Sequence, residues 1–162
     1  MLEYWWVLVA AILLVAAYAW MYFPARRVIP ESRLAEVRRD FHRQREHLEA
    51  KFVQIGSNPA RRNAPRWVDC EFEDDVAFAR NRVTGELMAL VGVTIALEES
   101  RNLSGRSGDL VGNLRAATAV FRFLQGRWET DGRAIFNYTP AEAIRFYHRD
   151  LEMIEHETPT RR

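Results

Sequence analysis

ELMALVGVTIAL, residues 86–97, decides the fold class of this chain, because it is apolar at nearly every position and has the period of a strand. Successive side chains of a β-strand point to opposite faces of a sheet. One face would carry Leu87, Ala89, Val91, Val93, Ile95 and Leu97, and the other Met88, Leu90, Gly92, Thr94 and Ala96. Two apolar faces are typical of a central strand that a helix covers on one side and that is at least partly covered on the other.

Alternating patterns on both sides of this stretch predict its neighbours in an antiparallel sheet. Residues 67–72 place Val68, Cys70 and Phe72 on one face, residues 73–75 interrupt the pattern, and residues 76–82 resume it. Further strands are expected at residues 113–124 and 127–137, where Asp131-Gly132 indicates a bulge or a tight turn that would split the last strand. We therefore expect an antiparallel meander of four to five strands.

An amphipathic helix is predicted before the sheet, from residue 31 to about residue 55. Its apolar side chains recur at helical spacing, so they share one face, which packs either on the sheet or on a partner helix. The candidate interaction face consists of Leu34, Val37, Phe41, Leu48 and Phe52.

A second helix is predicted after the sheet, from residue 140 to about residue 154. Thr139-Pro140-Ala141-Glu142 has the pattern of a capping box with proline in the first turn. The class is therefore α+β, and the order of a helix, an antiparallel meander and a helix resembles that of cystatin-like and nuclear-transport-factor-like domains. This likeness of element order implies no particular function.

A membrane anchor is predicted at residues 5–23, nineteen residues without a charge. A helix of that length spans about 28 Å, close to the ~30 Å hydrocarbon core of a bilayer. Aromatic side chains at both ends are typical of the membrane interface. They include Trp5, Trp6, Trp20 and Tyr22. The alternative is a cleaved signal peptide, with Ala17-Tyr18-Ala19 as its cleavage site, although the positive residues that begin such a peptide are missing.

The orientation follows from lysine and arginine, which are absent before the anchor and frequent directly after it. The positive-inside bias predicts an extracytoplasmic end at residues 1–4, a stem at residues 24–30, a cytoplasmic domain at residues 31–157 and a tail at residues 158–162. Residues 26–66 hold eleven basic and five acidic side chains, and residues 67–100 hold two basic and eight acidic ones. We expect the basic block to be charge that orients the anchor together with the solvated face of a helix, with lipid contact as a by-product. The net charge of +1 gives no reason to expect nucleic acid.

No residue pattern predicts catalysis, a cofactor or a metal site. The acidic run at residues 69–75 lacks the spacing and glycine of a calcium loop, and residues 104–112 lack the lysine of a phosphate loop. His148 has no partner in any motif, and the single cysteine, Cys70, excludes an internal disulfide and is expected to be a small buried residue.

Two functions follow from these observations. The first is a single-pass membrane protein whose cytoplasmic α+β domain is an interaction or scaffolding module, for a protein partner or a second copy, and is not an enzyme. The alternative is a small-ligand-binding domain, or an enzyme, with a pocket between the sheet and the first helix. Gly92, Ala117 and Ala119 are small residues on central strands that could leave room for a ligand.

Overall fold

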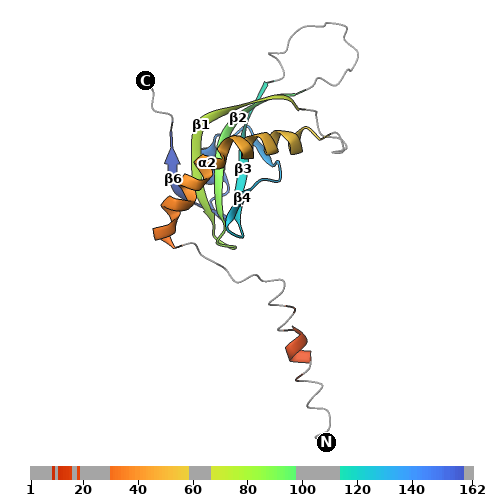
Figure 1. The fold of residues 1–162 in the computed structure, drawn as a ribbon, viewed down its shortest axis with the longest axis vertical. Helices are drawn as coiled ribbons and strands as arrows, with labels where there is room; N and C mark the ends of the chain where they lie inside the picture. The colour runs from red at the N-terminus through yellow and green to blue at the C-terminus, as the bar shows by residue number, and fades with distance from the viewer. Residues whose placement is uncertain are drawn as a thin grey trace, which may run out of the picture.

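The computed structural model describes residues 9, 11–15, 18, 30–58, 67–97 and 114–158 of the 162. It confirms an α+β fold in which helices pack against an antiparallel sheet of six strands (Figure 1). The elements are α2 (Glu31–Gly56), β1 (Trp67–Asn81), β2 (Leu87–Leu97), β3 (Leu114–Leu124), β4 (Arg127–Glu129), β5 (Ala134–Phe136), α3 (Pro140–Phe146) and β6 (Leu151–Glu157).

The sheet has the order β4-β3-β2-β1-β6, and β5 also pairs with β3. β2 lies at its centre, as its two apolar faces predict. The last strand of the meander is split into β4 and β5, which is one of the two outcomes expected for Asp131-Gly132. Gly132 has φ +71° there, and Thr130 Oγ1 donates to the Val120 carbonyl while it accepts from the Gly132 amide.

Helix α2 crosses one face of the sheet and closes the main core (Figure 1). The ring of Phe41 packs edge-on against those of Phe78, Phe121 and Trp128, at centroid distances of 5.7, 5.6 and 4.9 Å. Trp128 Nε1 also donates a 3.0 Å hydrogen bond to the carbonyl of Val37. Of the two packing partners expected for this helix, the structure therefore uses the sheet.

Two bulges in β1 change the faces that simple alternation predicts. Trp67 pairs with Leu97 and Asp69 with Ala96, so Val68 is an extra residue in the strand. As a result Trp67 is in the core, with 9% of its surface exposed, and Val68 is 61% exposed. The prediction that Val68 shares the face of Cys70 and Phe72 is wrong for this reason.

The second bulge in β1 lies at residues 73–75, because Phe72 pairs with Val93 and Val76 with Val91. The acidic residues that interrupt the sequence pattern therefore form a bulge within one strand of fifteen residues and do not separate two strands.

The C-terminal helix is shorter than predicted. α3 begins at the expected capping box but ends at Phe146, and Leu151–Glu157 forms β6 against the edge of β1. Main-chain hydrogen bonds to a sheet edge outweigh the helical spacing of a few apolar side chains, because local preference is weak beside tertiary pairing. α3 itself covers the face of the sheet opposite α2, where Ala143 and Ile144 pack on Ala77, Ala79 and Leu90.

In the part of the chain that the structure describes, no helix has both the length and the apolar character needed to cross a bilayer. The anchor predicted at residues 5–23 lies largely outside the described residues, as do Trp5, Trp6, Trp20 and Tyr22. The anchor therefore remains a prediction.

Candidate functional site

The candidate interaction face of α2 lies against the chain's own sheet. Phe41 and Phe52 are fully buried, Leu48 is 2% exposed and Leu34 is 8% exposed, while the partly buried Val37 packs against the same core. In this arrangement the sheet occupies the face, so a partner would have to bind elsewhere on the domain.

The small residues on the central strands are occupied in the same way. Ala117 and Ala119 face α2 and lie in the core that contains Phe52 and Phe121. Gly92 is on the opposite face, where a Cβ atom would come within 2.9 Å of Glu73 Oε2. These residues therefore make room for side chains of the chain itself.

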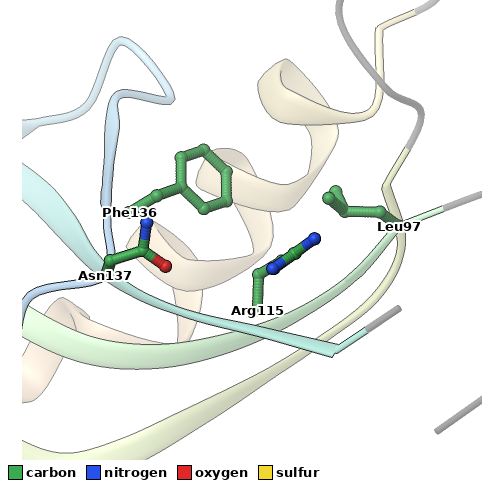
Figure 2. A pocket seen from close by; sticks show the side chains of 4 residues that line it. All are labelled: Leu97, Arg115, Phe136 and Asn137. Carbon is green, nitrogen blue, oxygen red and sulfur yellow. The ribbon is translucent and has the colours of Figure 1, made fainter. Parts of the chain in front are cut away.

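A hollow of about 220 Å³ is present at the open end of the sheet, on the side of α2. Figure 2 shows Arg115 and Asn137 on its floor, with Phe136 and Leu97 on either side. β2 supplies Leu97 and β3 supplies Arg115, while Phe136 and Asn137 come from the end of β5.

The register of the sheet explains how these residues meet. Arg115 lies two residues before Ala117, which pairs with Phe136, so the side chains of Arg115 and Phe136 point to the same face. Asn137 has φ +64°, a left-handed conformation that asparagine tolerates better than most residues. Its main-chain amide donates a 2.9 Å hydrogen bond to the carbonyl of Ala116. The turn at Asn137 therefore ends β5 beside Arg115.

The chemistry of this hollow suits binding. Arg115 is exposed and takes part in no ion pair among the residues that the structure describes. A guanidinium group presents a planar fork of donors that matches a carboxylate, and the side-chain amide of Asn137 adds further donors. The ring of Phe136 and the side chain of Leu97 supply apolar walls.

A second surface feature is the open half of β1. β6 pairs with β1 only from Val76 to Asn81, so residues 67–75 have no strand beside them on that edge within the described parts of the chain. The main-chain amide of Cys70 faces this edge, because it donates a 2.9 Å hydrogen bond to the carboxylate of Asp69 and not to β2. Main-chain groups on an unpaired edge are a template for another strand.

The acidic run at residues 69–75 is partly used by contacts within the domain. Asp74 pairs with Arg45 at 3.5 Å, and Arg45 Nη2 also donates to the carbonyl of Glu73. Asp75 contacts His156 Nε2 at 2.6 Å. No group of three or more histidine, cysteine or acidic side chains that could hold a metal ion exists among the described residues.

The end of β6 is held on both faces of the sheet. Arg38 pairs with Glu155, and His42 Nε2 lies 2.9 Å from Glu157 Oε2, on the side of α2, while His156 meets Asp75 on the other side. These residues were not identified from the sequence, because residues 151–154 were expected to be helical. The alternation of Glu155 and Glu157 with His156 was the available signal.

His148 and Cys70, the two remaining candidates that the structure describes, make no contact typical of a catalytic group within the described residues. His148 Nδ1 is 3.0 Å from the carbonyl of Arg145, a local contact at the end of α3. Burial, together with the charge of Asp69, raises the pKa of the Cys70 thiol to about 11, so the thiol is protonated and a poor nucleophile at neutral pH. The segment of residues 104–112 lies outside the described residues.

No protein-family description, curated protein or solved structure matches this chain.

Proposed function

We propose that this chain is a single-pass membrane-anchored protein whose small cytoplasmic α+β domain is an interaction module for a protein partner. The observation that carries the proposal is the mismatch in length between β1 and β6. β1 has fifteen residues and β6 pairs with its last six, so residues 67–75 offer an edge for binding. This edge takes the place of the α2 face as the candidate interaction surface.

Apolar exposure at the same end of the sheet supports this proposal. Val68 is 61% exposed and Leu114 is 49% exposed. Both lie at the same end of the sheet, on strands separated by β2, because Leu114 pairs with Ala96, which in turn pairs with Asp69. Val68 therefore adds exposed apolar surface directly beside the open edge of β1.

The composition of residues 5–23 supports the anchor. The stretch is uncharged, and the members of it that the structure describes are helical. Ile12, Leu13, Leu14 and Val15 are 64–72% exposed, so the domain does not bury them. Apolar side chains left uncovered by protein are what a lipid environment accommodates.

A photo-crosslinking amino acid at Val68 tests the interaction in native membranes. Val83 is the matched control, because it is also a valine and is 57% exposed. It lies in the turn between β1 and β2, at the opposite end of β1 from Val68. We expect a defined protein adduct from position 68 and none from position 83. Equal labelling at both positions, or no adduct at position 68, would contradict the proposal.

The second candidate function is small-ligand binding in the hollow at Arg115, favoured by an exposed guanidinium group beside an aromatic wall. Native mass spectrometry of the full chain, released from detergent, tests it. We expect a reproducible extra mass that disappears in Arg115→Gln and persists in Arg149→Gln, which changes an exposed arginine away from the hollow. A chain that carries no extra mass would leave the interaction module as the better explanation.

A further inference from the structure

We propose that the partner binds by β-strand addition, and that the added strand is an extended segment with basic side chains at alternate positions. This inference rests on the proposed function, because it names the kind of partner that the open edge of β1 fits.

The main-chain groups of two residues define the docking edge. Because the amide of Cys70 points away from β2, the alternation of an antiparallel pair makes the main chain of Phe72 point away from β2 as well. Asp69 and Glu71, by the same alternation, are turned toward β2 and pair with Ala96 and Thr94. The carbonyl of Cys70 and both main-chain groups of Phe72 are thus directed to the open edge.

The position of β6 shows where an added strand would lie. β6 runs antiparallel to β1, and its Glu157 is opposite Val76. A strand placed against residues 69–72 would therefore continue the line of β6 beyond its end, between the bulge at Val68 and the bulge at residues 73–75. The sheet order would then be extended on a side where the described chain has no other element.

The charges at this edge select the partner. Residues 67–75 contain five carboxylates and no basic side chain. Asp74 and Asp75 are paired and Asp69 accepts from Cys70, whereas Glu71 and Glu73 have no ion pair within the described parts of the chain. Opposite charges across neighbouring strands stabilise the pairing and like charges oppose it.

A second copy of this chain is a poor occupant for the same reason. Edge-to-edge pairing of two β1 strands would bring their carboxylates together, which is a device that disfavours aggregation through exposed edges. A segment with lysine or arginine at every second position is instead attracted to the edge. Its basic face would lie beside Asp69 and Glu71, and its other face would lie on the side of Cys70 and Phe72.

The test uses the full chain in lipid nanodiscs and fluorescent seven-residue peptides of alternating lysine and valine, measured by anisotropy. We expect the lysine–valine probe to bind and a glutamate–valine probe to fail. A lysine–valine probe that is N-methylated at every second amide retains its charge but cannot pair on one edge, so we expect it to lose binding as well. Equal binding of the methylated and unmethylated probes would overturn strand addition.

Two charge reversals provide a matched pair of variants. Glu71→Lys places a positive charge at the edge, and we expect it to weaken the lysine–valine probe by about fivefold. Glu46→Lys makes the same change on the exposed surface of α2 and should leave binding unchanged. Similar losses in both variants would show attraction to overall charge and would refute a site at the edge.

Hydrogen exchange locates the bound probe. We expect slower exchange in a fragment that contains residues 69–72 and no change in β6. If position 68 forms adducts but the lysine–valine probe does not bind, the proposal of an interaction module stands and the proposal of strand addition is refuted. The absence of adducts at Val68 would remove the proposed function itself, and exchange already slow without probe would show that the edge is occupied within the chain.

Discussion

The thiol of Cys70 is a weak nucleophile in the folded protein, because its surroundings favour the protonated form. It lies in β1 beside Asp69, and both burial and that carboxylate raise the pKa of its thiol to about 11. The sequence predicts a small buried residue, and in the structure Cys70 is only partly buried. Its environment adds that the thiol form is stabilised, since burial disfavours the thiolate.

We predict that Cys70 reacts slowly with iodoacetamide at pH 8 in the folded protein and rapidly in urea, because only the thiolate attacks. The raised pKa also makes the free energy of unfolding depend on pH. The contribution is complete below the unfolded pKa of 9.0 and is lost as the pH rises toward 11. Mass spectrometry measures the rate at which Cys70 is alkylated. Rapid labelling of the native protein would contradict the burial of its thiol.

The capping box at α3 gives a second prediction for single residues. Thr139→Ala removes the side chain that accepts from the amide of Glu142, and we expect the free energy of unfolding to fall by about 1 kcal/mol. Urea denaturation measures this loss. Thr84→Ala, which changes an exposed threonine in the β1–β2 turn, is the comparison and should cost less.

Glu142 also makes the stability depend on acid. Hydrogen bonds from the amide and hydroxyl of Thr139 lower the pKa of its carboxyl below 4.5. A lowered pKa contributes stability above the unfolded value, and the contribution is lost as the pH falls through the folded pKa. We expect Glu142→Gln to reduce the loss of stability as the pH falls below 4.5. An unchanged loss would mean that other carboxyl groups control acid unfolding.

At the scale of elements, α2 is held by its aromatic residues. Phe41 is fully buried and meets three aromatic rings of the sheet and of β4. We expect Phe41→Ala to lower the free energy of unfolding by about 3–5 kcal/mol, the range for a buried phenylalanine. Arg43→Ala, two residues away on the exposed face of the same helix, should change stability by less than about 0.5 kcal/mol. Similar values from thermal unfolding of both variants would contradict the packing of α2 on the sheet.

Strand β6 is the second element whose role can be tested. A chain that stops after Asp150 loses the main-chain partners of residues 76–81 and the buried side chain of Leu151. We expect this chain to aggregate, because a long apolar edge of β1 becomes unpaired. A chain that stops after Thr158 keeps β6 and should behave like the full chain in size-exclusion chromatography and circular dichroism. If the shorter chain folds normally, β6 is dispensable.

At the scale of the whole molecule, the proposed anchor and the domain have separate tests. We expect the full chain to remain with membranes after carbonate extraction, and Leu13→Arg combined with Leu14→Arg to release it, since each arginine at the centre of a helix opposes insertion by about 2.5–3.5 kcal/mol. Leu13→Ala with Leu14→Ala is the control. A reporter fused after Arg162 should be active in the cytoplasm, and activity only outside it would reverse the orientation.

Much of the fold could be predicted from local patterns. The central strand, the apolar face of α2 and the capping box at Thr139 were each predicted from the sequence and are present in the structure. The site could not be predicted in the same way. Arg115 and Phe136 are twenty-one positions apart, and β6 meets β1 across seventy or more residues, so neither contact leaves a periodic signal.

The sequence by itself determined the α+β class, the centre of the sheet and the starts of α2 and α3, because side-chain period and turn and capping patterns are properties of neighbouring residues. The tertiary structure alone decided that residues 151–157 pair as a strand, that Trp67 and not Val68 enters the core, and that the face of α2 is covered. Those outcomes depend on which distant main-chain groups and apolar surfaces find each other, since unpaired hydrogen-bonding groups and exposed apolar area are satisfied only in the assembled fold.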